Sequence, residues 1–360
     1  MSHDTLSDVL RAVRLRGAVF YFVSCRGEWA AEAPVGRDIA AAVMPGSGHV
    51  IEYHAVTEGE CWAAIVGEPP IRLRRGDIIM LPHGDAHVVS SAPGMRADPQ
   101  ISWYYEMNLR QLPFNLTCGV DVGPAMDPGA GGLAPPVEAA PSATLVCGFI
   151  GCDVLPFNPL IATLPRLLHL PATSDSAWSA QFVRLAAAES GRQRPGSKAL
   201  LERVSEMMFV DAVRRHFDSM PENNTGWLAG LRDRFVGRAL ALMHESPGAA
   251  WSIADLSTQV GLSRSALHER FVAMIGQAPM QYLAQWRMQL ASHLLRDSQS
   301  SVVSIALDVG YESEAAFARA FKRLVGMPPA AWRRKQEQPA AASGPGAHGA
   351  PAPRLASRGE

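Results

Sequence analysis

The sequence predicts a two-domain α+β protein, in which a β-rich N-terminal domain with trailing helices precedes an all-α domain. Short apolar or alternating runs, separated by Gly and Pro turns, fill residues 18–110 and predict strands. Amphipathic helical patterns replace them after about residue 171. A pattern of helix, glycine turn and helix then occurs twice, fifty positions apart. A chain of 360 residues is long enough to bury a core in each domain.

The N-terminal strands are predicted by "AVFYFVS" (18–24), "CWAAIVG" (61–67) and "DIIMLP" (77–82), which favour a sandwich or barrel. The Pro- and Gly-rich segment 121–142 is expected to form a mobile loop. After it, "ATLVCGFIGCDV" (143–154) is again typical of a strand and is expected to return to the same sheet.

Two helices are predicted next. On the first, Trp178, Phe182 and Leu185 are spaced at i, i+4 and i+7. The second covers residues 198–217, and its apolar residues occupy more than one stripe. Two interpretations of this second helix stay open: a homodimer contact, or a helix buried on two sides within one chain.

The repeated pattern predicts two helix-turn-helix units. Gly261 and Gly310 supply the turns, and a serine stands at the predicted start of each helix. The apolar positions that match between the two units are Leu267 with Phe317 and Phe271 with Phe321. Residues 231–335 contain 13 Lys+Arg against 8 Asp+Glu, whereas residues 1–230 contain 18 against 24. A basic helix-turn-helix region favours binding to double-stranded DNA, with the second helix of each unit in the major groove.

These residues also carry a family resemblance. The run "SIADLSTQVGLSRSALHERFVAMIGQAPMQYLAQWRMQLASHLL" (252–295), followed by "SIALDVGYESEAAFARAFKRLVGMPPAAWRR" (304–334), resembles the AraC/XylS family of bacterial transcription regulators. The resemblance covers about 100 residues. It implies a cytoplasmic, sequence-specific DNA-binding regulator that is not an enzyme. It further implies an activator that contacts RNA polymerase, and the homodimer interpretation of the second helix would make this regulator a dimer.

The resemblance and the helical pattern together nominate residues for DNA contact. On the helix that follows each turn, the outward positions near its start face the groove. Arg319 suits a guanine or a phosphate and Glu269 suits a cytosine amine, whereas Arg264, Lys322 and Arg323 suit phosphates. The full set of DNA-binding candidates is Arg264, Ser265, His268, Glu269, Ser313, Glu314, Ala315, Arg319, Lys322 and Arg323.

A second resemblance lies in the N-terminal domain. The residues Gly76, Pro82, Gly84 and His87 have the spacing G-x5-P-x-G-x2-H, which is similar to the second cupin motif. The segment "EYHAVTE" (52–58) resembles the first cupin motif, H-x-H-x3-E, with a glutamate in place of its first histidine. The resemblance implies a cupin-type β-barrel, which is also found fused to AraC-type regulators.

The cupin resemblance implies ligands for a divalent metal such as Zn, Mn or Fe. The candidates are Glu52, His54, Glu58 and His87. The departure at Glu52 leaves two alternatives open, a metal site or a metal-free barrel that is structural or binds a small molecule. His54, Glu58 and His87 are the corresponding candidates for binding an unknown effector. A metal-dependent cupin enzyme with an accessory helical domain is the alternative to the regulator.

The five cysteines predict no disulfide framework and fit a reducing cytoplasm. Cys25, Cys147 and Cys152 are candidates for a redox sensor, against the commoner case of buried structural thiols. No apolar stretch reaches the roughly 18 residues of a membrane span, and no secretion signal is expected.

The expected organisation has five parts: a cupin-like sensing domain (1–170), a helical pair for dimerisation (171–222), a linker (223–229), a double helix-turn-helix domain (230–335) and a disordered tail (336–360).

Overall fold

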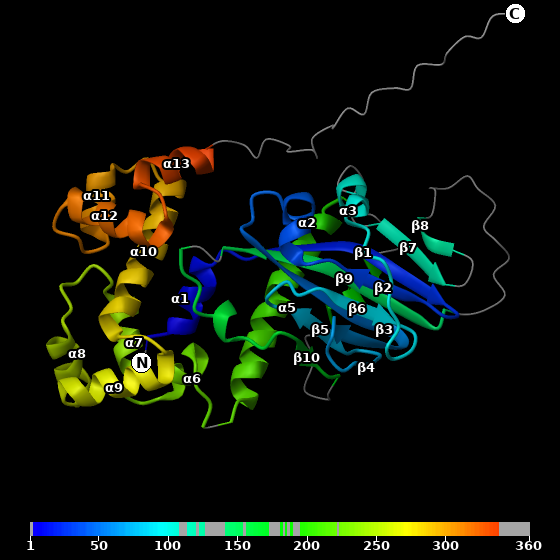
Figure 1. The fold of residues 1–360 in the computed structure, drawn as a ribbon, viewed down its shortest axis with the longest axis horizontal. Coiled ribbons are helices and arrows are strands. Elements are labelled where there is room, and N and C mark those ends of the chain that lie inside the picture. Colours follow the sequence, from blue (N-terminus) through cyan, green and yellow to red (C-terminus); the bar gives the residue numbers. More distant parts are fainter. Residues whose placement is uncertain are drawn as a thin grey trace, which may run out of the picture.

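The computed structural model describes residues 3–107, 114–119, 122–126, 141–153, 156–172, 181–182, 184–185, 188–189, 195–221 and 223–337. Trp178, most of the predicted loop at 121–142 and the predicted tail beyond residue 337 lie outside these residues. The described chain forms a curled sheet with covering helices and a separate group of helices (Figure 1). Within the described residues, no helix is both long and apolar enough to cross a membrane.

The sheet of the N-terminal domain contains ten described strands. Their bounds are β1 Arg16–Arg26, β2 Ala30–Ala33, β3 His49–Ile65, β4 Ile71–Arg74, β5 Ile78–Leu81, β6 His87–Ser90, β7 Phe114–Gly119, β8 Val122–Met126, β9 Ala143–Cys152 and β10 Leu168–Leu170. The order along the main path is β10-β5-β3-β9-β1-β7-β8. Among the described pairings, only β1 with β7 is parallel.

The long strand β3 makes the sheet curl. Its first half pairs with β5 and β9, and its second half pairs with β4 and β6, so one strand belongs to both layers. Strand β9 is buried along almost its whole length, as expected for a strand covered on both faces. The predicted cupin-like architecture is confirmed, and residues 143–152 return to the sheet as expected.

Helix α5 (Ser197–Ser219) packs directly on β1 and confirms the predicted second helix. Gly17 permits this close approach, because a Cβ there would lie 2.2 Å from the backbone oxygen of Glu202. Tyr53 Oη lies 2.9 Å from Ser205 Oγ and donates to the backbone oxygen of Ala18. The helix is therefore fixed to the sheet by both close packing and buried hydrogen bonds.

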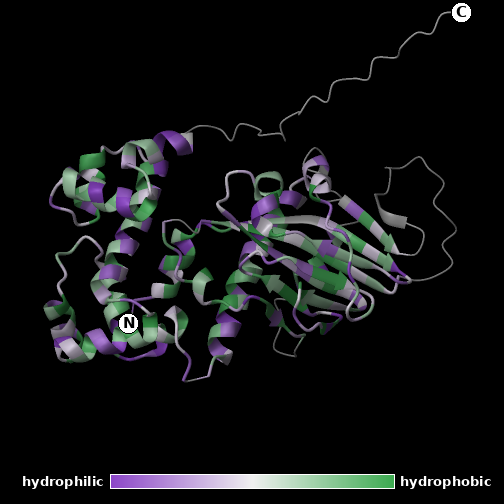
Figure 2. Ribbon diagram, in the orientation of Figure 1, coloured by the Kyte–Doolittle hydropathy of each residue, from purple (hydrophilic) through white to green (hydrophobic). Residues whose placement is uncertain are grey.

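The remaining helices of the N-terminal region are α1 (Thr5–Ala12), α2 (Gly36–Val43), α3 (Ile101–Met107) and the 3-10 helix η1 (Ile161–Thr163). The C-terminal domain contains α6 (Trp227–Arg232), α7 (Val236–Glu245), α8 (Ile253–Val260), α9 (Arg264–Ile275), α10 (Pro279–Asp297), α11 (Val302–Asp308), α12 (Glu314–Val325) and α13 (Pro329–Glu337). Hydrophobic and hydrophilic residues alternate around these helices, as Figure 2 shows.

The two helix-turn-helix units are α8–α9 and α11–α12, as predicted. Gly261 and Gly310 lie at the turns with φ of 78° and 82°, a conformation that favours glycine. Ser252 forms a capping box with Asp255 at the start of α8. Ser301 and Ser313 cap α11 and α12. The local sequence signals therefore specify the boundaries of these helices.

The N-terminal and C-terminal domains share a hydrophobic core. One cluster of buried residues extends from Tyr53 in the sheet through Val9 of α1 to Phe271 and Trp286. The second unit has a separate core around Phe317 and Phe321. Helix α1, blue in Figure 1, lies beside α7 and α10 of the C-terminal domain. The first unit and helix α10 therefore rest on the N-terminal domain, whereas the second unit does not share its core.

Trp227 lies near the end of the segment 223–229 that is expected to be a linker. It begins helix α6, is almost completely buried, and donates a 2.7 Å hydrogen bond from Nε1 to the hydroxyl of Tyr282. Burial of this large aromatic side chain stabilises the fold, so the chain between α5 and α6 leads directly into the shared core.

The structure contains one disulfide, between Cys25 and Cys118, whereas no disulfide framework was expected from the sequence. The parallel pairing of β1 with β7 places these two residues directly opposite each other, with a Cα–Cα distance of 4.6 Å. This distance is within the range that a disulfide spans. The sequence does not reveal the strand register that brings them together.

Candidate functional site

The helices that follow the two turns, α9 and α12, each bury one face and expose the other. On α9 and α12, Leu267, Phe271, Phe317 and Phe321 are fully buried. The predicted DNA-contacting residues lie on the opposite faces of these helices or at a helix cap. All of them are exposed: Arg264, Ser265, His268, Glu269, Ser313, Glu314, Ala315, Arg319, Lys322 and Arg323. The burial of one face orients the other face towards solvent, where a DNA groove is accessible.

Not every polar residue on these helices is available to a partner. The Ser313 hydroxyl accepts a hydrogen bond from the backbone N–H of Ala316, so its main contact is the helix cap. Arg270 Nε donates a 2.9 Å hydrogen bond to Asp233, between α6 and α7. This ion pair fixes α9 to the preceding helices and leaves Arg270 outside the candidate contact set.

A second site lies inside the curled sheet. Glu52 and His54 stand two residues apart on β3 and therefore point to the same face, and His87 begins the neighbouring strand β6. His54 Nε2 lies 2.7 Å from His87 Nε2, and Glu52 Oε2 lies 3.5 Å from the same His87 nitrogen. One ligand atom of each residue lies within 4.8 Å of those of the other two, and all three residues are buried.

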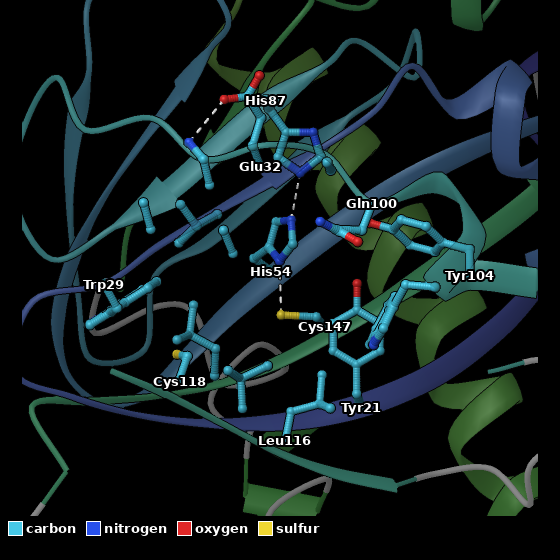
Figure 3. A pocket seen from close by; sticks show the side chains of 18 of the residues that line it. Tyr21, Trp29, Glu32, His54, His87, Gln100, Tyr104, Leu116, Cys118 and Cys147 are labelled. Atoms are coloured by element: carbon cyan, nitrogen blue, oxygen red, sulfur yellow. Dashed lines mark hydrogen bonds between the residues drawn. The ribbon is translucent and has the colours of Figure 1, made fainter. Parts of the chain in front are cut away.

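The two histidines belong to a directional hydrogen-bond chain (Figure 3). His87 Nδ1 lies 2.9 Å from the backbone oxygen of Asp85, which can only accept, so Nδ1 carries the proton. His87 Nε2 then accepts from His54 Nε2–H, and His54 Nδ1 accepts from the Cys147 thiol at 2.8 Å. Burial lowers the pKa of His54 well below its usual value and that of His87 to about 4, so both rings are neutral.

Glu52 is the anomalous member of the group. Its carboxyl is 2% exposed, and neither oxygen has a hydrogen-bond partner among the described residues. Burial raises its pKa to about 8. A buried carboxyl without partners is costly, so its presence inside the sheet calls for a compensating interaction.

These residues fit a divalent metal. Two imidazole nitrogens and one carboxylate suit Zn, Mn or Fe. Moving one proton on His54 from Nε2 to Nδ1 frees both Nε2 atoms for a metal, with Cys147 Sγ and the Asp85 oxygen as acceptors for the Nδ1 protons. A possible metal-binding triad of Glu52, His54 and His87 is therefore present in the cupin domain.

Glu58, the fourth ligand suggested by the cupin motif, does not join the triad. It is exposed near the end of the β3–β9 pairing, just after a register shift between Val56 and Glu58. Such an irregularity changes the face to which the following side chains point. The structure thus brings together three of the four predicted ligands, and the fourth, Glu58, is exposed to solvent.

A cavity of about 330 Å³ opens beside the triad. It is lined by residues of β1, β2, β7 and β9, by residues near α3, and by His54 and His87, whereas Glu52 is not among its lining residues. Figure 3 shows Tyr21, Trp29, Tyr104 and Leu116 around this space. The position next to the two histidines makes it the candidate effector site.

The cysteines nominated for redox sensing occupy unfavourable environments for a reactive thiol. Cys25 is in the disulfide, and Cys147 and Cys152 are buried. Burial raises the pKa of Cys147 well above its usual value and that of Cys152 to about 12. A thiol that stays protonated is a poor nucleophile towards oxidants.

The cavity residues Trp29, Tyr21 and Tyr104 were not nominated from the sequence. Tyr21 lies on β1, Trp29 just before β2 and Tyr104 on α3, so no local spacing in the sequence connects them. The adjacent cupin motif was the available signal, because it located the two histidines at one end of the same cavity.

Comparisons with known proteins agree with the two-domain organisation. A cupin family model matches residues 4–218, more than half of the chain, and a helix-turn-helix domain model matches residues 256–335. An AraC-like transcription regulator of Streptomyces lividans is 31% identical over 93% of this chain and 100% of its own. The regulator AlkR of Acinetobacter baylyi is 27% identical over 92% of this chain and 99% of its own.

A solved structure of the DNA-binding domain of AdpA, in complex with a target DNA, is 30% identical over 29% of this chain and 92% of that one, with a TM-score of 0.28. The family assignment depends on the cupin model and on the full-length relatives. From these, the chain belongs to the AraC-like transcription regulators, with an N-terminal cupin domain and a C-terminal helix-turn-helix DNA-binding domain.

Proposed function

We propose that this regulator binds its operator through both recognition helices and responds to a small molecule in the cupin cavity. The observation that carries the proposal is the arrangement of exposed candidate residues on α9 and α12, joined by α10, which packs on the cupin domain. Exposed Arg319 and Glu269 would contact bases, and Arg264, Lys322 and Arg323 would contact phosphates.

A gel-shift titration against the upstream intergenic DNA, with competitor at two salt concentrations, tests this proposal. Arg319→Ala is expected to weaken specific binding by roughly fivefold to a hundredfold, the range for one good base contact. Arg37→Ala on α2, an exposed arginine of the cupin domain outside both α5 and the helix-turn-helix units, is the matched control and should not change binding. Equal affinities for the wild type and Arg319→Ala would refute the placement of α12.

A homodimer through α5 is part of the proposal. Leu200 and Met207, two turns apart on this helix, are 43% and 46% exposed although both are large and apolar. An apolar stripe of this kind is stabilised by a second copy of the same helix. Analytical sedimentation of the wild type and of Leu200→Glu measures the oligomeric state. Transcription in vitro with RNA polymerase tests activation.

We propose the domain boundaries that the sequence predicts, with the two parts held together by their shared core. Residues 1–170 with 171–222 would form the sensing and dimerising part, and residues 230–335 the DNA-binding part. Co-purification of the two parts after cleavage between Ser219 and Trp227 tests whether their packing survives without a covalent connection.

We also propose that Glu52, His54 and His87 bind one divalent metal with a sensing or structural role and no catalytic turnover. The absence of hydrogen-bond partners for both Glu52 oxygens among the described residues supports it. A bound metal would supply positive charge that neutralises the buried carboxylate.

Metal analysis of purified protein, combined with Zn, Mn and Fe titrations, tests this second proposal. The wild type is expected to bind one equivalent, and Glu52→Gln is expected to lose at least tenfold in affinity. Glu58→Gln is the matched control, because Glu58 lies outside the triad. An equal loss in both variants, or no binding by the wild type, would contradict the metal site.

A further inference from the structure

Helix α10 joins the two helix-turn-helix units and runs from one to the other (Figure 1). Near its middle, Trp286 belongs to the buried cluster that contains the first unit, and Met288 belongs to the buried cluster of the second. Arg287 stands between these two residues and is half-buried. It therefore lies at the boundary between the cores of the two units.

The guanidinium of Arg287 holds the loop that leads into the first unit. Its Nε donates a 2.8 Å hydrogen bond to the backbone oxygen of Pro247, and its Nη2 donates a 2.7 Å hydrogen bond to that of Ala249. Both carbonyls belong to residues 246–251, which connect α7 to α8. Because the guanidinium is planar, two such bonds fix the orientation of the loop as well as its distance from α10.

The same guanidinium faces the turn of the second unit. Arg287 Cζ lies 5.9 Å from the centre of the Tyr311 ring, within the range of a cation–π interaction. Tyr311 follows the turn glycine and packs edge-on against Phe317 of α12, with 5.6 Å between the ring centres. One side chain on α10 therefore contacts both the segment before α8 and the segment before α12.

The two segments also touch each other directly. A Cβ on Gly248 would lie 2.7 Å from the backbone oxygen of Asp308, and a Cβ on Gly310 would lie 2.6 Å from the backbone oxygen of Gly248. A Cβ on Gly310 would also lie 2.8 Å from Arg287 Nη2. These distances are too short for any side chain, so the loop, the turn and the guanidinium form one tightly packed junction between the units.

We propose that Arg287 is a positioning residue that fixes α9 and α12 relative to each other and thereby sets the spacing of the two DNA segments that one protomer recognises. The inference rests on the proposed function, because spacing matters only if both helices bind DNA. One inserted base pair moves two segments of B-DNA apart by about 3.4 Å and rotates them by about 35°. A rigid pair of helices tolerates this change poorly, whereas a loosely held pair adjusts to it but must be ordered on binding.

Gel-shift titrations of the full-length protein on DNA with altered spacing test the proposal. Footprinting on the upstream intergenic DNA first defines the two protected segments, and one base pair is then added or removed between them. The wild type is expected to lose about tenfold or more in affinity, the scale of one mismatched base pair. Arg287→Met is expected to bind the natural spacing about threefold to tenfold more weakly, and a changed spacing should then cost it less than about threefold.

Two further variants separate the position of the helices from stability alone. Arg333 donates from Nε to the Leu295 carbonyl and from Nη2 to the Ser300 carbonyl, so Arg333→Met loses the same kind of fork away from the loop 246–251. It should lower stability and keep the wild-type spacing penalty. Gly248→Ala disturbs the junction without removing a charge and should reduce the penalty as Arg287→Met does. Circular dichroism establishes that each variant is folded.

Each outcome decides between the proposals. A full spacing penalty in Arg287→Met overturns the role of Arg287, and so does an equal reduction in Arg333→Met, which would attribute the effect to lost stability. A phosphate contact by Arg287 would instead reduce the dependence of log affinity on log salt by about one and leave the spacing penalty unchanged. Scrambling one protected segment tests the proposed function separately, because unchanged wild-type affinity would refute binding through both helices. If that affinity falls but the wild type binds all spacings equally, the fixed spacing alone is refuted.

Discussion

Asp153, the residue that follows strand β9, accepts a 2.8 Å hydrogen bond from Arg296 Nη1 near the end of helix α10. The same strand carries Cys147, whose side chain contacts His54 in the cavity wall. Strand β9 therefore connects the cavity to the helix between the two helix-turn-helix units. The Asp153–Arg296 pair therefore joins the strand that lines the cavity to helix α10.

Arg296→Met tests the contribution of this ion pair. The side chains of Asp153 and Arg296 are 16% and 17% exposed, so the pair is intermediate between a surface pair and a buried one. We expect the free energy of unfolding to fall by about 1–3 kcal/mol. Chemical denaturation measures it, with Arg72→Met as the control, because Arg72 and its partner Glu60 are 47% and 52% exposed. An equal effect of both substitutions would contradict a special role for Asp153.

Gln289→Leu is expected to have a larger effect on the same interface. Gln289 is fully buried on α10, where its Oε1 accepts from Phe157 N–H and its Nε2 donates to the backbone oxygen of Ala12, both at 3.0 Å. Leucine fills a similar volume but leaves both backbone groups without a partner, at about 1–3 kcal/mol each. We expect a fall of about 2–6 kcal/mol in the free energy of unfolding.

The control for Gln289→Leu is Gln281→Leu, an exposed position on the same helix. Limited proteolysis gives a second measurement, since loosening of α10 from the cupin domain should increase cleavage between Ser219 and Trp227. A variant as stable as the wild type, with unchanged proteolysis, would show that these hydrogen bonds do not hold the two domains together.

The C-terminal domain could be predicted closely from sequence because its signals are local. Ser252, Gly261 and Ser313 each specify a helix end within a few residues, and the structure shows the expected caps and turns. Phe317 and Phe321 face the core, because residues four apart lie on one side of a helix. No long-range information is needed for any of these features.

The interior of the cupin domain could be predicted only in part. The motif spacing nominated His54 and His87, but the register shift in β3 that turns Glu58 to solvent is not encoded in that spacing. The pairing of Cys25 with Cys118 and the position of Trp29 in the cavity likewise depend on which strands are neighbours. Strand order and register are set by the whole sheet, and one sequence does not show them.

Ser313→Ala is expected to destabilise the second recognition helix. The Ser313 hydroxyl caps α12 by accepting the Ala316 N–H at 3.3 Å, and loss of such a cap costs about 0.5–2 kcal/mol. DNA affinity should fall in parallel, because α12 must be ordered to enter the groove. Ser313→Asp restores a capping acceptor and should recover stability but not DNA affinity, since it adds a negative charge near phosphates. Denaturation and gel-shift titrations measure the two effects separately.

His244 predicts a loss of stability in acid. It is buried at the end of α7, where it stacks on Trp286 at 4.1 Å and accepts a 2.8 Å hydrogen bond from the Tyr282 hydroxyl. Asp8 Oδ2 lies 3.8 Å from its Nδ1, and His3 is the other titratable group nearby. Burial lowers the pKa of His244 to about 3, whereas the unfolded chain has a histidine pKa of about 6.5.

Proton binding by the unfolded state determines how the free energy of unfolding depends on pH. Between these two pKa values the unfolded state binds a proton that the folded state does not, so stability falls as the pH drops below about 6.5 and is unaffected above it. From pH 7 to pH 5, His244 should remove about 2 kcal/mol from the free energy of unfolding. His244→Phe keeps the stacking on Trp286 and should reduce the difference between the two pH values by that amount. Urea denaturation measures this difference in stability, with His268→Phe, at an exposed position, as the control.

An unchanged pH difference in His244→Phe would mean that the acid sensitivity originates elsewhere. His293, whose pKa is lowered by burial to about 4, would then be the next residue to replace.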